Sequence, residues 1–339
     1  MSRDLLEVVE LKKYFEIRTG VLRKVTGHVR AVDEVSFTVR SGETFGLVGE
    51  SGCGKTTIGR TVIRAATPTG GEIHYRPNGQ ASHEIASMDV RELRPIRRTM
   101  QMIFQDPFSS LSPRMTVRDI VAEPLTIQGV RHGSRLDERV AQALHAVGLN
   151  PQYMNRYPHA FSGGQRQRTG IARAIITEPR FIVADEPVSS LDVSVQAQIL
   201  ELLLRLKGEL NLSYLFISHD LAVVKYLCDR VAVMYVGKIV EVADKHDLFL
   251  DPKHPYTAAL MAAIPLPDPR KRDTVESLEG EVPDPANPPS GCYFHPRCKF
   301  AQDICKTERP ELRELPGSGE RPHLAACHFA EKLSLHPQP

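Results

Sequence analysis

The sequence has no long hydrophobic run. None of its apolar stretches approaches the roughly 18 residues that a helix needs to cross a bilayer. Its start, MSRDLLEVVELKKYF, carries acids among the apolar residues and therefore lacks the uninterrupted apolar core of a secretory signal. We expect a protein that stays in the cytosol, or one that docks on the cytosolic side of a membrane through a partner.

A strong excess of charge of either sign is also missing. Lys and Arg number 43, Asp and Glu number 41, and the sequence pI is about 8.2. This balance falls short of the strongly basic surface that a dedicated nucleic-acid-binding protein needs. With 339 residues, 41% of them hydrophobic and 25% charged, the chain is instead typical of a globular protein with a substantial core.

Prolines are scarce in most of the chain and concentrated toward its end. Ten of the 25 lie in the first 251 residues, and fifteen lie from Pro252 onward. We therefore predict packed secondary structure first and an irregular, loop-rich extension afterwards. The predicted boundary separates a domain of residues 1–264 from an extension, 265–339, that holds four of the six cysteines. In a cytosolic chain, cysteines favour metal ligation or plain burial over disulfides.

Short apolar strands alternate with helical patterns in the first domain. Strand patterns occupy 31–40, 43–49, 180–187 and 212–220, and helical spacing occupies 55–66 and 193–210. This alternation predicts an α/β fold with a mainly parallel sheet. No strand pattern lies between Asp106 and Thr177, so we expect a helical subdomain to interrupt the sheet.

The stretch GESGCGKTT fits the phosphate-binding pattern G-x-x-x-x-G-K-[ST]. It lies between a predicted strand and a predicted helix, a context in which backbone N–H groups and the helix N-terminus surround phosphate oxygens. Lys55 is predicted to neutralise the β- and γ-phosphates of ATP, and the Thr56 hydroxyl to complete a Mg²⁺ shell. The predicted nucleotide-contacting residues of this loop are Gly49, Glu50, Ser51, Gly52, Cys53, Gly54, Lys55, Thr56 and Thr57.

Polar side chains end two of the predicted buried strands. The run FIVADE ends in Asp185 and Glu186, and the run FISHD contains His219. Asp185 fits a Mg²⁺-bound water, Glu186 fits the base that orients the attacking water, and His219 is expected to reach a γ-phosphate. Ligands bind at the carboxyl edge of parallel sheets, which favours these roles over a solvated turn.

The stretch FSGGQRQR, about one hundred residues after the phosphate loop, carries a family resemblance. Together with ADEP, SSLD and SHD, it makes the chain resemble the ATP-binding domain of an ABC transporter, from about Leu5 to Ile264. The resemblance implies a P-loop NTPase fold of the ABC nucleotide-binding type. Such a fold has a mainly parallel core sheet, an antiparallel β subdomain and a helical subdomain.

The resemblance also implies roles for residues outside the phosphate loop. Gln105 in IFQDP would touch Mg²⁺ and the attacking water, and Asp192 in SSLD would lie at a dimer seam. The residues that would contact the γ-phosphate of an ATP held by a partner's phosphate loop are Ser162, Gly163, Gly164 and Gln165. An aromatic side chain near the N-terminus would stack on adenine, with Phe15 our first choice and Tyr14 our second. Packing of these aromatics in an edge strand is the alternative.

Finer features resemble the ATP-binding subunits of oligopeptide and dipeptide permeases. They are the GHV-containing insertion at 16–30, the stretches QDPFSSLSPRMTV and HPYTAALMAAIP, and the cysteine-containing tail. The resemblance implies a peripheral protein on the cytoplasmic side of the cell (inner) membrane. The implied partners are a paralogous ATP-binding subunit in a heterodimer, two transmembrane permease subunits and an external substrate-binding protein. Peptides, metal chelates and sugars all remain open as cargo.

The resemblance implies that the chain is the ATP-hydrolysing subunit of an ABC importer, with oligopeptides or dipeptides as the first choice of cargo. Two rival functions remain open beside this importer. A nucleic-acid-associated ABC ATPase with a zinc module is disfavoured by charge, because residues 268–339 hold ten Lys and Arg against twelve Asp and Glu. A regulatory module that holds ATP without hydrolysing it is disfavoured by the presence of Glu186 and His219.

Four cysteines follow the spacing C-x5-C-x6-C-x21-C in the tail, at Cys292, Cys298, Cys305 and Cys327. Structural zinc usually takes tight C-x2–4-C pairs, whereas wider spacing suits a four-iron–four-sulfur cluster with separate iron corners. What related permease ATPases look like also favours a cluster. Zinc and unligated, simply buried cysteines remain the alternatives. Cys53 and Cys228 belong to the ATPase part and are not expected to participate.

Overall fold

The computed structural model describes residues 4–20, 23–77, 79, 81–106, 110–130, 133–262, 280–316 and 321–335. By packing, the chain divides into two compact units, each assembled from separated segments. Unit 1 comprises Met1–Glu7, Thr38–Thr44 and His74–Ile217, and unit 2 comprises Val8–Phe37, Phe45–Ile73 and Ser218–Pro339. The boundary predicted between residues 264 and 265 lies outside the described residues and stays a prediction.

Unit 1 is built around three parallel strands. β7 pairs with β8 on one side and with β6 on the other, so that Val183 lies opposite both Leu215 and Met102. Every residue of β7 and β8 is buried, which explains why both strands read as continuous apolar runs. The strands are β6 (Met100–Ile103), β7 (Phe181–Asp185) and β8 (Ser213–Ile217).

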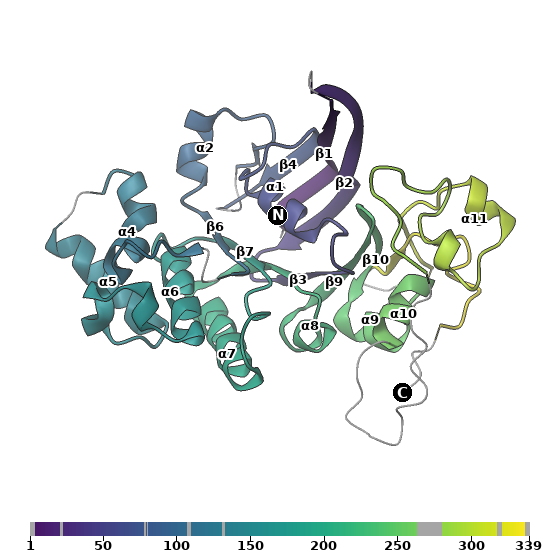
Figure 1. Cartoon of the computed structure of the whole chain (residues 1–339). Coiled ribbons are helices and arrows are strands. Elements are labelled where there is room, and N and C mark those ends of the chain that lie inside the picture. Colours follow the sequence, from purple (N-terminus) through teal and green to yellow (C-terminus); the bar gives the residue numbers. More distant parts are fainter. Residues whose placement is uncertain are drawn as a thin grey trace. The chain divides into compact units, whose positions relative to one another are not determined.

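Helices make up most of the rest of unit 1. α4 packs on α5 and α6, and the three lie together in the teal part of Figure 1. No strand occurs among the described residues between 110 and 177, as the sequence pattern indicated. The helices are α2 (Val90–Ile96), α4 (Val117–Ile127), α5 (Ser134–Ala146), α6 (Gly163–Ile175) and α7 (Val193–Leu210), with 3₁₀ helices η1 (Pro151–Asn155) and η2 (Pro158–Ala160).

Unit 2 contains a mixed sheet in the order β11-β12-β10-β9-β3. β3 and β9 run parallel, and β10 returns antiparallel to β9. The C-terminal extension adds two short strands, with Ala325 of β12 opposite Glu241 of β10, so its yellow segment lies beside β10 (Figure 1). The strands are β3 (Thr44–Val48), β9 (Arg230–Tyr235), β10 (Lys238–Asp244), β11 (Arg313–Glu314) and β12 (Leu324–Ala325).

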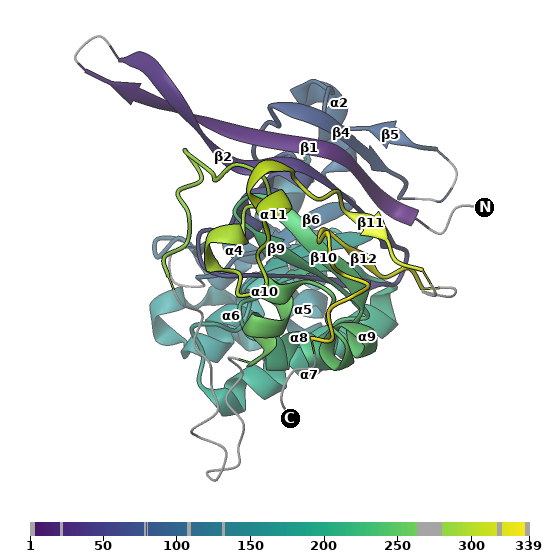
Figure 2. The same ribbon diagram turned by 90° about the vertical axis from the view of Figure 1, so that its right-hand side faces the viewer.

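A second sheet begins with the two longest strands of the chain, β1 (Asp4–Thr19) and β2 (Lys24–Arg40), which lie side by side (Figure 2). The predicted insertion at 16–30 therefore continues these strands, while its residues 21 and 22 lie outside the described part. β1 also borders β4 (Gly70–Tyr75), whose end pairs antiparallel with β5 (His83–Glu84). The predicted α/β class, with parallel core strands and an antiparallel β subdomain, is confirmed.

The first helix of unit 2 is shorter than the pattern at 55–66 predicted. It ends at Val62, because Arg64 adopts a left-handed backbone with φ of 56°. The N–H groups of Ala65 and Ala66 both donate to the carbonyl of Arg60 and close the helix. The helices of unit 2 are α1 (Lys55–Val62), α8 (Leu221–Leu227), α9 (Lys245–Leu250), α10 (Pro255–Ala262) and α11 (Asp303–Thr307), with the 3₁₀ helix η4 (His295–Arg297). Among the described helices, none is long and apolar enough to span a membrane.

Helix α7 offers a test of the packing in unit 1. Leu203 is fully buried at 0% exposure, whereas Val193 on the same helix is 82% exposed. Leu203→Ala should lower the free energy of unfolding by about 2–5 kcal/mol, because it removes buried methyl groups and leaves a cavity. Val193→Ala, the matched control, should change it by less than about 0.5 kcal/mol. Equal losses in urea denaturation of the two full-length variants would contradict this packing.

Candidate functional site

The phosphate-binding pattern forms a tight loop between β3 and α1. Gly49 has φ of 151° and Gly54 has φ of 109°, values that residues with a Cβ rarely adopt. A Cβ on Gly49 would also overlap the carbonyl oxygen of Met234, and one on Gly54 the carbonyl oxygen of Ala31. The loop is therefore packed backbone against backbone on neighbouring segments of unit 2.

Lys55 is buried at the start of α1, with 5% exposure. Its ammonium group donates to the carbonyl oxygens of Gly49 at 2.8 Å and Glu50 at 2.9 Å. The cation thus lies in the concavity of the loop, where phosphate oxygens would compete for it. Cys53 is 2% exposed, and its carbonyl accepts from the N–H of Gly237.

The two predicted carboxylates lie at the end of the buried strand β7, with Asp185 as its last residue and Glu186 directly after it. Asp185 is 1% exposed, and Glu186 turns the chain with φ of 45°, in the left-handed region. This backbone costs a residue other than glycine about 1–2 kcal/mol, and the N–H of Glu186 holds it by donating to Ile217 at 2.9 Å. The side-chain amide of Gln105 donates to Glu186 Oε2 at 2.8 Å. The structure therefore brings two predicted site residues, 81 positions apart, into direct contact.

His219 is exposed, two residues after Ile217, the last residue of β8. The next residue, Asp220, caps α8 by accepting from the N–H groups of Ala222 and Val223. His219 thus lies just beyond the end of a buried strand, as its sequence context predicted, and the helix α8 that follows it was not predicted.

The stretch SGGQ, from Ser162 to Gln165 and here called the signature stretch, lies at the start of helix α6. Ser162 Oγ accepts from the N–H of Gln165 and Gln165 Oε1 accepts from the N–H of Ser162, which makes a capping box. A Cβ on Gly164 would lie 2.6 Å from Val195 Cγ1, so only glycine fits between α6 and α7 there. Gly163 and Gly164 therefore present backbone N–H groups at the positive end of a helix.

Asp192 caps the neighbouring helix α7 by accepting from the N–H of Val195 at 3.0 Å. Hydrogen bonds from the Ser194 hydroxyl and from this N–H hold the pKa of Asp192 below its usual value. Two helix N-termini thus carry the SGGQ and SSLD stretches in unit 1.

The two candidate aromatics near the N-terminus differ in their contacts. The hydroxyl of Tyr14 donates a hydrogen bond to Asp33 Oδ1 at 2.5 Å. Burial is the main reason why the pKa of this hydroxyl lies above its usual value. Phe15 is 45% exposed, with the ammonium of Lys13 5.0 Å from its ring centre. The ring of Phe15 is thus accessible to solvent, and its stacking on adenine stays a prediction.

The four cysteines of the tail line one cavity in unit 2. Burial raises the pKa of the thiols of Cys292, Cys298 and Cys327 to about 11, and neighbouring cysteines contribute to each rise. Within the described ranges, no three His, Cys, Asp or Glu side chains form a group that could hold a single metal ion. Cys53 and Cys228 do not line this cavity.

His254 lines the same cavity and is 1% exposed. Its Nδ1 accepts from the N–H of Tyr256 at 3.1 Å, and burial lowers its pKa to about 3, so the ring is neutral with its proton on Nε2. Nε2 has no hydrogen-bond partner among the described residues. A buried donor of this kind calls for an acceptor in the cavity.

Sequence reasoning missed the contacts that reach the phosphate loop from the end of the chain. The hydroxyl of Tyr256 accepts from the N–H of Glu50, and the guanidinium of Arg297 pairs with the Glu50 carboxylate. Tyr256 lies in the stretch HPYTAALMAAIP, a feature of the family resemblance, and Arg297 lies in the tail directly before Cys298, a predicted cluster ligand. Their separations of 206 and 247 positions leave no local signal that predicts the contacts.

Comparisons with known proteins agree with these features. The profile of the ABC transporter family matches residues 32–189, and the profile of the oligopeptide/dipeptide transporter C-terminal region matches residues 240–305. The chain is 50% identical to the oligopeptide transport ATP-binding protein AppF of Bacillus subtilis, over 97% of this chain and 98% of that one. It is 53% identical to a putative peptide import ATP-binding protein of Brucella ovis, over 95% of this chain and 97% of that one.

A solved structure is also similar to this chain in fold. The dimeric ATP-binding cassette MJ0796, in a post-hydrolysis state with ADP and Pi bound, matches 71% of this chain and 98% of its own. The TM-score is 0.61 and the sequence identity 27%.

The phosphate loop generates a prediction about its own packing. Gly54→Ala should lower the free energy of unfolding by about 3 kcal/mol or more, because the new methyl group combines a left-handed backbone with overlap on Ala31. Gly52→Ala, the control, has φ of 80° but meets no atom within 4 Å, and should cost only about 1–2 kcal/mol. Thermal or urea denaturation of the full chain compares them, and a smaller loss at Gly54 would refute the packing described.

Proposed function

Because the chain belongs to the family of ABC transporter ATP-binding subunits, we propose that it hydrolyses ATP to drive the import of peptides across a cell membrane. The observation that carries the proposal is the similarity to two transport ATP-binding proteins over nearly the whole chain, at 50% and 53% identity. The match to the oligopeptide/dipeptide C-terminal region supports peptides as cargo over metal chelates or sugars.

ATP would bind with its phosphates in the loop from Gly49 to Thr57. The loop geometry and the buried ammonium of Lys55 support this role, because both offer positive charge to phosphate oxygens. Bound Mg²⁺ would neutralise charge on the β- and γ-phosphates, and the residues whose oxygen chemistry suits it are Thr56, Gln105 and Asp185. Phe15 would stack on the adenine.

Glu186 would accept a proton from the water that attacks the γ-phosphorus while the bond to the β-phosphate oxygen breaks. Its contact with Gln105 supports this role, since the amide orients the carboxylate. His219 would contact the γ-phosphate.

The signature residues of one chain would complete the site of a partner. Ser162, Gly163, Gly164 and Gln165 sit at the N-terminus of α6, whose positive end suits an approaching γ-phosphate. We propose a heterodimer with a paralogous ATP-binding subunit, with Asp192 at the seam. Two permease subunits, an external substrate-binding protein and a location on the cytoplasmic side of the inner membrane complete the proposal. The transport proteins among the relatives give no support to the nucleic-acid alternative.

The proposed base is tested by Glu186→Gln. The variant should still bind ATP but lose about 10²–10⁴ in turnover, because the amide cannot accept the proton. It should also accumulate as an ATP-bound dimer. Glu201→Gln, a control at an exposed position on α7, should keep wild-type turnover. Steady-state ATP hydrolysis by the assembled complex measures both, and undiminished turnover in Glu186→Gln would exclude it as the base.

The four tail cysteines would hold an inorganic centre, an iron–sulfur cluster in preference to zinc. The shared cavity supports a centre, and so does the buried, unpartnered Nε2–H of His254, which could donate to a sulfur carrying negative charge. Thiols that surround one cavity without forming a single-ion group, in the part of the chain described, suit a cluster better than one zinc. The surrounding loops have a small core of Leu315, Ala325 and Ala330, so such a centre would crosslink them.

Colour tests the cysteine centre. Protein purified without oxygen should be brown, absorb near ~400 nm and lose this absorbance in Cys298→Ser. Cys228→Ala, whose thiol is buried outside the cavity, should keep it. Colourless protein with one zinc per chain would move the site to zinc, and the absence of both metals would contradict a centre of either kind.

A further inference from the structure

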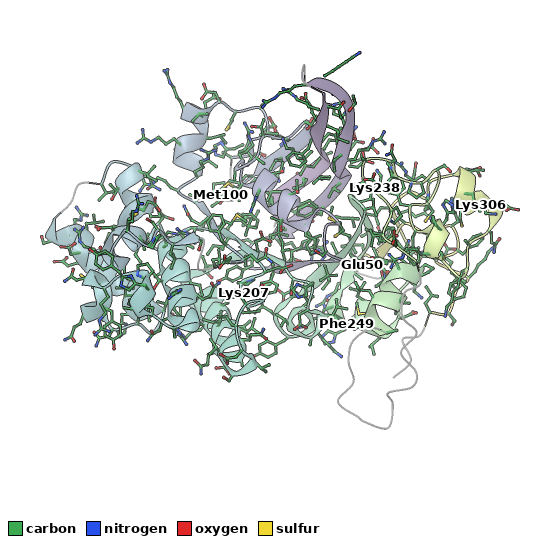
Figure 3. The ribbon with its side chains drawn as sticks, viewed as in Figure 1. Glu50, Met100, Lys207, Lys238, Phe249 and Lys306 are labelled. Carbon is green, nitrogen blue, oxygen red and sulfur yellow. The ribbon has the colours of Figure 1, made fainter. Side chains whose placement is uncertain are left out.

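The phosphate loop contains an acidic residue whose negative charge would disfavour the binding of phosphates. Glu50 is the second residue of the loop, where nucleotide phosphates would add negative charge. Its carboxylate is paired with Arg297, with Nη1 2.8 Å from Oε2 and Nη2 3.1 Å from Oε1. The two terminal guanidinium nitrogens thus donate to one carboxylate oxygen each, which is the strong, two-pronged geometry of an Arg–carboxylate pair. Figure 3 labels Glu50, which lies toward the yellow C-terminal segment that contributes Arg297.

Arg297 is itself fixed in place. Its side chain is 4% exposed, whereas that of Glu50 is 25% exposed. The guanidinium lies 5.9 Å from the ring centre of Tyr235 and within 3.4 Å of its hydroxyl. The hydrogen bonds that its guanidinium donates to Glu50 raise the pKa of Arg297, so its charge is permanent. It ends the 3₁₀ helix η4 and directly precedes Cys298, one of the cavity-lining cysteines.

The main chain of Glu50 is held from the same side. Its N–H donates to the hydroxyl of Tyr256 at 2.9 Å. The ring of Tyr256 lies 4.6 Å from that of Tyr235 and 5.4 Å from that of Phe294, which precedes Arg297 in the tail. An aromatic cluster and one ion pair therefore connect the cysteine-containing segment to the second residue of the phosphate loop.

We propose that Arg297 is a positioning residue for nucleotide binding, which acts by holding and neutralising Glu50 and so ties the C-terminal extension to the phosphate loop. Without Arg297, an uncompensated carboxylate would stand in the loop that receives the phosphates. Repulsion between charges a few ångströms apart in a partly buried site weakens binding substantially. The inference rests on the proposed ATP-binding function.

The test compares full-length variants by titration with a fluorescent ATP analogue and Mg²⁺. Arg297→Gln should bind the analogue about tenfold more weakly than wild type. Arg297→Lys, which keeps the charge and loses the paired geometry, should fall between them. Arg313→Gln removes another ion pair of the same extension, Arg313–Glu331, with both side chains about half exposed, and should bind like wild type.

A double-mutant cycle separates positioning through Glu50 from a general loss of structure. In the Glu50→Gln background, Arg297→Gln should cost about twofold or less, because no carboxylate remains to be neutralised. A tenfold loss in both backgrounds, or no loss in either, would overturn the inference. If Arg297→Gln does not fold, Arg297→Lys in the same two backgrounds gives the same decision. Failure of the wild-type chain to bind the analogue would instead contradict the proposed function.

Discussion

The close packing of the phosphate loop on its neighbours is the constraint on which the proposed site depends. Gly49 and Gly54 touch the carbonyl oxygens of Met234 and Ala31 so closely that no Cβ fits. The carbonyl of Cys53 in the same loop accepts from the N–H of Gly237. These contacts preset the backbone that closes around phosphates, so little ordering remains to be done when a nucleotide binds. The ion pair of Glu50 with Arg297 extends this constraint to the C-terminal part of unit 2.

The proposed catalytic and nucleotide-binding residues lie at the ends of strands and helices. Strand β7 delivers Asp185 and Glu186, and the left-handed backbone of Glu186 aims its carboxylate at Gln105. Helices α6 and α7 present the signature and SSLD stretches at their N-termini, where backbone dipoles favour an anion. Rigid elements thus hold the groups on which the proposed ATPase cycle relies, and the short segments between them carry the reacting side chains.

Local patterns in the sequence predicted much of this structure. Apolar runs and helical spacing predicted the positions of β3, β7, β8 and α7 correctly. These elements could be predicted because the residues that they bury are close together in the sequence. α1 ended early because the backbone of Arg64 overrides helical spacing. The tail was expected to be irregular because of its many prolines, and the strands β11 and β12, two residues long each, are too short to show a pattern that would predict them. The family motifs indicated that Gln105 and Glu186 belong to one site, which is consistent with their hydrogen bond. The ion pair of Arg297 with Glu50 joins residues 247 positions apart and could be found only in the folded structure.

In the proposed function, this chain couples ATP hydrolysis to peptide import. The most direct measurement is peptide uptake into vesicles that contain the chain with a paralogous ATP-binding subunit and two permease subunits, with the external binding protein added. ATP hydrolysis and peptide accumulation should rise together when the binding protein carries peptide. A chain that fails to assemble with the permease subunits, or hydrolysis that is indifferent to the loaded binding protein, would contradict the claim.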